Sequence, residues 1–264
     1  MYFCTQKGGL CCRIGYFTIK SIPPHYASRT LMDEKKEIGQ LFDRIANTYD
    51  RFNHLLSLNI DKRWRRRAAS CLKPSEEVLD VAVGTADLAL EMLRQKRCHR
   101  VTGLDLSAEM MRLGKEKAEK QGFSDRIDFQ LGSALEMPYA EGRFDSVTCA
   151  YGVRNFSDLD KGLGEMFRVM KEDGQLVILE FSYPANRLIR GLYDFFFSRI
   201  MPLVGRIISK DPTAYLYFRE SVKGFIWGEE MLQHLRQAGF QEAAYKPLTF
   251  GITTLYTATK PKIS

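Results

Sequence analysis

The chain has 264 residues, of which 45% are hydrophobic, and a formal net charge of +7 at pH 7. This length suits one α/β domain with a small cap or insertion, and the composition excludes a disordered chain. Residues 1–32 hold four basic residues and no acid, which leaves 35 basic against 32 acidic residues in the rest. That balance is ordinary for a globular domain, so we predict no nucleic-acid partner.

Residues 1–32 form a basic leader without a long apolar run, which excludes a secretory signal and a membrane span. These residues contain no acid, a feature that they share with mitochondrial transit peptides. The favoured interpretation is that Met32 is the true start, and that the leader is disordered or not part of the natural protein. The six cysteines form no CxxC pair, so we predict no metal site, no disulfide framework and a reducing compartment.

From Ile38 to Leu56, apolar residues recur every three or four positions, which predicts a helix. The basic run KRWRRR follows at residues 62–67, and we interpret it as a solvated helix face rather than a phosphate or membrane contact. Residues 33–72 are therefore expected to form an N-terminal helical cap on a single domain, 33–264.

After Pro74, short apolar runs alternate with helical stretches, which predicts a mostly parallel sheet with helices on both faces. Ser107 is placed to cap a helix N-terminus, and Gly174 to mark a helix end and the turn into the next strand. The predicted helices are 86–96, 107–121 and 158–170, and the predicted strands are 77–82, 100–105, 126–131, 144–150 and 175–181.

The last part of the chain differs from this alternation. Residues 184–227 form an apolar insertion, predicted to be helical, whose charges interrupt it well short of the roughly 20 apolar residues that a membrane span needs. Residues 241–247 and 252–259 then predict an antiparallel hairpin with a turn near Phe250.

The stretch VLDVAVGTADLAL, residues 78–90, has the strand, turn and helix order of a cofactor-binding loop. In an open parallel sheet, ligands bind beyond the carboxyl ends of the strands, against backbone N–H groups at a helix N-terminus. Gly84 permits close approach of a ligand, and Asp105, 25 residues after Asp80, can accept hydrogen bonds from ribose hydroxyls. These features alone fit either a dinucleotide or S-adenosylmethionine.

The loop lacks the G-x-G-x-x-G pattern that holds a pyrophosphate, because alanines stand at positions 82 and 86 around its single glycine. Asp87 also adds negative charge where a pyrophosphate needs positive potential. A sulfonium cofactor has no phosphate and tolerates nearby carboxylates, so the pattern favours S-adenosylmethionine.

Six stretches then follow one another in a distinctive order: FDRIANTYD (42–50), the loop itself, GLDLS (103–107), GSALEMPY (132–139), YGVRN (151–155) and LEFS (179–182). Over residues 33–260 this set resembles the ubiquinone/menaquinone biosynthesis C-methyltransferases, a group of class I S-adenosylmethionine-dependent methyltransferases. The resemblance implies a Rossmann-like α/β fold with a mostly parallel seven-stranded sheet, an antiparallel C-terminal hairpin and helices on both faces.

The resemblance also implies which residues bind the cofactor. Thr85 matches the threonine of the family's Gly-Thr-Gly-Asp loop, and Asp105 matches the ribose-binding acid. Ser133 and Ala134 match the pair beside the adenine, where the family usually has Asp or Asn first. Ala86 replaces the second glycine of the loop. If that position needs a positive φ, alanine costs roughly 1–2 kcal/mol, and if it is already helical, alanine costs nothing.

The implied reaction moves a methyl group from sulfonium sulfur to a ring carbon of a prenylated quinol, without a metal. Arg154 is expected to stabilise the developing phenolate and Asn155 to orient the quinol oxygen. The structural alternatives are that Arg154 pairs with a carboxylate and that Asn155 forms a turn. Candidates for the general base are His54, Asp50, Tyr151 and a water relayed to Arg154.

The leading hypothesis is conversion of demethylmenaquinol to menaquinol by a cytoplasmic enzyme. The basic, apolar insertion suggests peripheral contact with the inner face of an anionic membrane, although simple packing of its aromatic residues is the favoured alternative. The sequence does not decide whether the chain forms a homo-oligomer. Other hypotheses are a ubiquinone-pathway C-methyltransferase or a bifunctional enzyme, a small-molecule or sterol methyltransferase, and a non-catalytic scaffold that has kept the fold.

Overall fold

The computed structural model describes residues 59–200 and 212–262, together with Gly39, Phe42, Asp43, Ala46 and Ser57. The predicted leader and most of the helix predicted from Ile38 to Leu56 lie outside these residues. Within that helix, the four described positions (39, 42, 43 and 46) are all helical.

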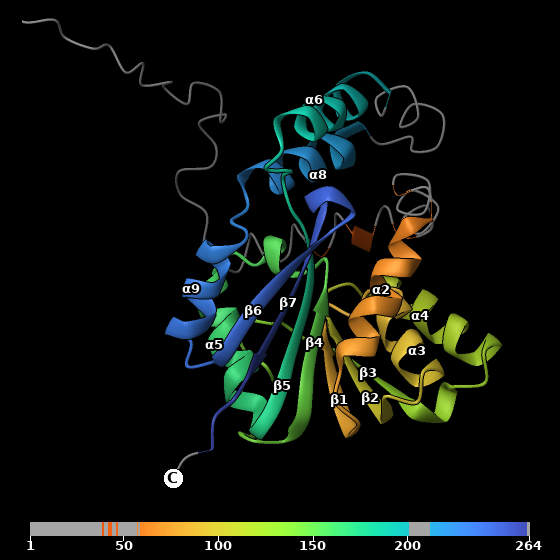
Figure 1. Cartoon of the computed structure of the whole chain (residues 1–264). Helices are drawn as coiled ribbons and strands as arrows, with labels where there is room; N and C mark the ends of the chain where they lie inside the picture. Colours follow the sequence, from red (N-terminus) through yellow and green to blue (C-terminus); the bar gives the residue numbers. More distant parts are fainter. Residues whose placement is uncertain are drawn as a thin grey trace, which may run out of the picture.

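One sheet of seven strands, in the order β3-β2-β1-β4-β5-β7-β6, forms the centre of the molecule (Figure 1). Strand β7 runs antiparallel between β5 and the edge strand β6, whereas β1 to β5 are parallel. The predicted fold class is therefore confirmed. The strands are β1 (Ser75–Val81), β2 (Cys98–Asp105), β3 (Ile127–Leu131), β4 (Phe144–Ala150), β5 (Met170–Phe181), β6 (Gln241–Leu248) and β7 (Thr253–Thr259).

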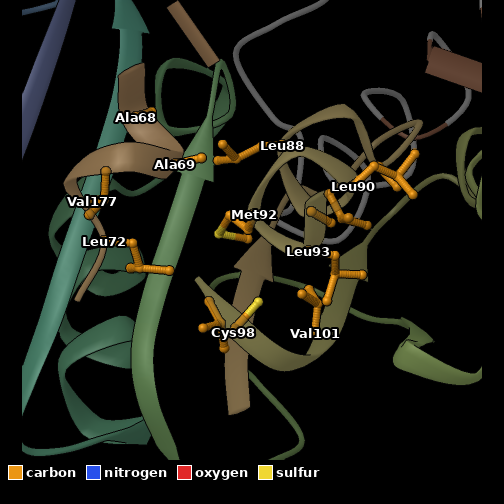
Figure 2. Close-up of a cluster of buried hydrophobic side chains, with 14 of the residues drawn as sticks. Ala68, Ala69, Leu72, Leu88, Leu90, Met92, Leu93, Cys98, Val101 and Val177 are labelled. Atoms are coloured by element: carbon orange, nitrogen blue, oxygen red, sulfur yellow. The ribbon is translucent and has the colours of Figure 1, made fainter. Parts of the chain in front are cut away.

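Helices cover both faces of this sheet because successive strand residues point to opposite sides. Val78 joins a core under α2 (Ile60–Cys71), α3 (Asp87–Arg94) and α4 (Ala108–Lys120), whereas its neighbour Leu79 joins a core under α5 (Leu159–Val169) and α9 (Glu229–Gln237). Figure 2 shows part of the first core, where Met92 and Leu93 of α3 lie near Cys98 and Val101 of β2, and Leu72, which directly follows α2, lies farther along the sheet. Each of these five helices buries apolar side chains against the sheet.

Strand β5 begins five residues earlier than predicted. It starts at Met170, directly after α5, and the register against β4 shifts between Phe144 and Ser146. Asp173 has a φ of 59°, and a Cβ on Gly174 would lie 2.6 Å from the Lys171 carbonyl oxygen. The turn predicted at Gly174 is therefore an irregularity inside the strand, which the apolar pattern does not reveal.

The apolar insertion provides α6 (Arg187–Phe195), a π-helix η4 (Phe196–Ile200) and α8 (Pro212–Gly224), which lie beyond the carboxyl end of β5 (Figure 1). Tyr193, Phe197, Phe218 and Val222 form its own small core. Among the described residues, no helix has both the length and the apolar character that crossing a bilayer requires. Short 3₁₀ helices are η2 (Ser124–Arg126), η3 (Val153–Asn155) and η5 (Thr249–Gly251).

Candidate active site

A cavity opens at the carboxyl ends of β1, β2 and β4, where the strand order reverses direction. It holds about 770 Å³, open solvent at its mouth included. Its walls combine small loop residues, one carboxylate and several apolar side chains. The lining residues include Phe42, Gly84, Asp105, Leu106, Met110, Ser133, Ala134, Tyr151, Asn155 and Phe156.

The loop after β1 is left-handed at three alternate positions, with φ values of 54° at Ala82, 54° at Gly84 and 66° at Ala86. Ala86 is the N-cap of α3, so it stands before the helix rather than inside it. A Cβ added at Gly114 of α4 would lie 3.3 Å from the Ala86 methyl, and one added at Gly152 would lie 2.6 Å from the Ala82 methyl. Ala86 is fully buried and does not line the cavity, so its methyl group packs towards α4.

Asp105 ends β2 with its carboxylate at the cavity wall. Its Oδ2 accepts a hydrogen bond from the Gly84 N–H at 2.8 Å, and its Oδ1 accepts one from the Ser107 N–H at 2.9 Å. Burial raises the pKa of this carboxyl group, and these N–H donors oppose that rise. An ionised carboxylate has about four lone-pair sites, so the group can also accept a hydrogen bond from a ribose hydroxyl. The predicted capping role of Ser107 is confirmed, because its Oγ accepts from the Met110 N–H.

Two of the remaining predicted cofactor residues line the cavity and one does not. Ser133 and Ala134 follow β3 at the wall, and the Ser133 Oγ accepts a hydrogen bond from the Leu135 N–H at 3.2 Å. Thr85 is buried behind the loop, where its Oγ accepts a hydrogen bond from Lys117 Nζ at 2.9 Å. A cofactor contact by the Thr85 side chain stays a prediction.

The two predicted catalytic residues occupy different surroundings within η3. Asn155 lines the cavity. Arg154 does not, because its guanidinium is buried, donates to Glu180 Oε1 at 2.8 Å and to the Tyr151 carbonyl oxygen at 2.6 Å, and lies between two phenylalanine rings. Burial raises the pKa of the Tyr151 phenol, so this side chain stays protonated near neutral pH and is unsuited as a general base. His54 and Asp50 lie outside the described residues.

Sequence reasoning missed two features of the site. Phe42 lines the cavity and Asp43 hydrogen-bonds to Ser107, and the FDRIANTYD stretch predicts neither role. In the basic run, Lys62, Arg63, Arg66 and Arg67 are exposed, but Arg65 is not. It is buried, pairs with Asp61 and lies 5.2 Å from the centre of the Tyr151 ring. The solvated-face interpretation is therefore wrong for Arg65, whose partner four residues earlier was the available signal.

The family model of the ubiE/COQ5 methyltransferases matches residues 29–260. The chain belongs to this family. Its predicted identity as an S-adenosylmethionine-dependent methyltransferase is thereby confirmed.

Relatives of this methyltransferase share its length as well as its motifs. It is 42% identical over 229 residues to a demethylmenaquinone methyltransferase of Bacteroides fragilis. This match covers 86% of this chain and 94% of the relative. It is 41% identical over 233 residues to a ubiquinone/menaquinone biosynthesis C-methyltransferase of Geobacter sulfurreducens, with 87% and 91% covered.

Solved structures support the fold of this methyltransferase at much lower identity. The [4+2]-cyclase SpnF matches with a TM-score of 0.63 at 19% identity, covering 86% of this chain and 97% of the other. A methyltransferase of Thermotoga maritima, described as S-adenosylmethionine-dependent, matches with a TM-score of 0.60 at 18% identity, with 84% and 99% covered.

Proposed function

We propose that this methyltransferase moves a methyl group from S-adenosylmethionine to a ring carbon of demethylmenaquinol, giving menaquinol. Relatives that carry the name demethylmenaquinone methyltransferase, at 39–42% identity over 86% of the chain, support this substrate. The observation that carries the proposal is the half-buried Asp105 carboxylate, presented at the switch-point cavity by two backbone N–H donors.

The cavity suits this cofactor chemically. When bound, S-adenosylmethionine supplies a methyl group on a positively charged sulfur. We assign the Asp105 oxygens to the ribose hydroxyls, and Ser133 and Ala134 to the adenine edge. Leu106, Met110 and Phe156 offer apolar wall for the adenine faces. The carboxylate nearby favours a cationic ligand and disfavours a pyrophosphate.

The carbon nucleophile needs electron density from the quinol oxygen, whose phenol-like pKa lies near ~10. We assign Asn155 to contact that oxygen and orient the ring, because Asn155 lines the cavity. Glu180 balances the positive charge of Arg154, so Arg154 is better suited to hold η3, and through it Asn155, than to touch the substrate. This assignment makes Arg154 a positioning residue.

Methyl transfer from labelled S-adenosylmethionine tests the proposal. Label should enter demethylmenaquinol, and a preference for the ubiquinone precursor would replace the proposed substrate. Asp105→Ala should weaken cofactor binding about 100-fold or more, since it removes a charged acceptor from a buried site. Asn155→Ala should keep cofactor affinity and lower turnover. If the unchanged chain does not bind millimolar cofactor, it is a scaffold and no enzyme.

We further propose that this methyltransferase meets its prenylated substrate at the cytoplasmic surface of a membrane. Leu188, Leu192 and Phe195 repeat at helical spacing on α6, and their exposed fractions are 73%, 60% and 59%. Exposed Arg187 and Arg199 flank this stripe. Apolar and cationic side chains on one helix match an anionic lipid surface.

Co-sedimentation with vesicles tests the membrane contact. The unchanged chain should bind vesicles containing phosphatidylglycerol, and Leu188→Glu/Leu192→Glu should bind at least tenfold more weakly. Leu131→Glu, at a 55% exposed residue on β3, is the matched control. Equal binding by both variants would exclude α6 as the contact, and a change of oligomeric state in the α6 variant would assign the stripe to a second copy.

A further inference from the structure

Asp43 joins the N-terminal segment to the first turn of α4. Its Oδ1 accepts a hydrogen bond from the Ser107 hydroxyl at 2.5 Å and from the Glu109 N–H at 3.2 Å. The Glu109 N–H is one of the donors at the start of α4 that find no partner within a helix. Asp43 therefore caps α4 from 64 residues away in the sequence.

Ser107 connects this contact to the cofactor cavity. The residue is completely buried, and its hydroxyl donates to Asp43 while it accepts from the Met110 N–H. Its backbone N–H donates to Asp105 Oδ1, and Asp105 Oδ2 accepts from Gly84. A continuous set of hydrogen bonds thus runs from the N-terminal segment to the loop after β1.

Phe42 gives this connection a second consequence. Its side chain lines the cavity, next to the residue that is bound to α4. Whatever fixes Asp43 therefore also fixes the part of the cavity wall that comes from outside the α/β core.

We propose that Asp43 is a positioning residue for cofactor binding, which holds Phe42 against the cavity and holds the Ser107–Asp105 pair in its binding orientation. The inference rests on the proposed binding of S-adenosylmethionine in this cavity. A carboxylate suits the position, because a charged acceptor bonds more strongly than an amide and a helix N-terminus favours negative charge.

Binding of S-adenosylhomocysteine, the demethylated product of the cofactor, tests the proposal without a quinol. Calorimetry should show about tenfold weaker binding for Asp43→Ala, the effect of losing one charged hydrogen-bond partner. Stopped-flow measurements should place most of this loss in the dissociation rate, since a wall segment is released. Asp43→Asn keeps one acceptor oxygen and should recover part of the affinity.

Asn186→Ala is the matched control. Asn186 caps its own helix, α6, by accepting from the Leu188 and Ile189 N–H groups, and it does not line the cavity. It should leave affinity for S-adenosylhomocysteine unchanged. A double-mutant cycle between Asp43→Ala and Ser107→Ala should show coupling, with the double variant no weaker than the worse single variant.

Two results would overturn the inference: an unchanged affinity for Asp43→Ala, or an equal loss for Asn186→Ala. If Asp43→Ala does not fold, Phe42→Ala must weaken binding through a faster dissociation rate, and a normal rate for that variant contradicts the proposal. If the unchanged chain fails to bind S-adenosylhomocysteine, the proposed function fails instead.

Discussion

At the residue scale, the loop after β1 keeps a glycine-type backbone with only one glycine in it. Ala82 and Ala86 both adopt positive φ values, a conformation that costs an L-residue roughly 1–2 kcal/mol. Their methyl groups gain packing against positions 152 and 114, where glycine leaves the necessary space. The sequence left two possibilities for Ala86, strained or helical. The structure gives strained backbone with a methyl directed away from the cavity.

Substitution of Ala86 should therefore affect stability more than cofactor binding. In Ala86→Gly, relief of ~1–2 kcal/mol of strain is offset by lost burial of one methyl, ~0.8 kcal/mol, and by a more flexible unfolded chain, ~0.5–1 kcal/mol. We expect a change in unfolding free energy within about 1 kcal/mol and an unaltered cofactor affinity. Ala86→Val should lose about 2–3 kcal/mol, because a branched residue at positive φ also crowds Gly114.

Urea unfolding and calorimetry with the cofactor measure both quantities. Tighter cofactor binding by Ala86→Gly would show that Ala86 crowds the ligand after all.

Other residues show where sequence reasoning stops. Asp105 is predictable because a carboxylate directly after a buried strand must emerge at the carboxyl edge of the sheet. The direction of the Thr85 side chain is not predictable, since it depends on Lys117, which only the packing of α4 brings within hydrogen-bond distance. The same holds for Arg154, whose partner Glu180 lies on a different strand.

At the element scale, the Arg154–Glu180 pair holds three pieces of chain together. Glu180 belongs to β5 and Arg154 to η3, and the guanidinium lies 5.4 Å from the ring centre of Phe218 in α8. Both charged side chains are almost fully buried, with exposed fractions of 1% and 4%. Removing one partner of such a pair leaves an uncompensated charge in an apolar setting.

Glu180→Gln should destabilise the protein by about 3–5 kcal/mol and lower turnover, since it releases η3 and α8 together. Asp128→Asn is the control, because its pair with Arg100 is at least half exposed on both sides. That variant should leave the unfolding free energy nearly unchanged, because solvent screens an exposed ion pair. Denaturant titration measures the unfolding free energy of both variants. A similar loss in the two would show that the buried pair does not stabilise the contact between β5, η3 and α8.

Element order was predictable because apolar runs and helical stripes alternate along the chain. The irregular start of β5 was not, because the polar residues Lys171, Glu172 and Asp173 separate Met170 from the apolar run that begins at Leu176. Met170 pairs with Phe144 of β4, whereas pairing with β4 resumes, and pairing with β7 begins, only at Gln175, and no local pattern encodes such a gap in the register.

At the scale of the whole molecule, the carboxyl end of the sheet collects buried acids. Asp80, Asp105 and Glu180 are all buried or nearly so, and burial raises the pKa of each. For Asp80 the pKa rises to about 7, while Thr148 donates to its Oδ1 at 2.6 Å and opposes the rise. The folded state therefore holds a proton on Asp80 that the unfolded chain releases near pH ~4.

Stability should consequently fall as pH rises from about 4 to about 7, since the folded state binds more protons than the unfolded state in that range. Asp80→Asn keeps an acceptor for Thr148 and carries no charge, so it should lack this loss. The unfolding free energy of the variant, relative to that of the unchanged chain, should therefore rise by an amount on the order of 3 kcal/mol between pH 5 and pH 8. Urea unfolding at both pH values measures it, and a constant difference would show that Asp80 titrates normally.

The pairs Ala86–Gly114 and Ala82–Gly152 also constrain the order in which substitutions can be made in this protein. A glycine-rich loop grafted from another methyltransferase would leave methyl-sized gaps opposite Gly114 and Gly152. The reverse change, alanine at position 152 with Ala82 still present, would force two methyl groups to within 2.6 Å. A side chain can therefore be added at position 152 only after Ala82 has become glycine and Cys149, whose Sγ lies 2.7 Å from the same Cβ position, has also made room.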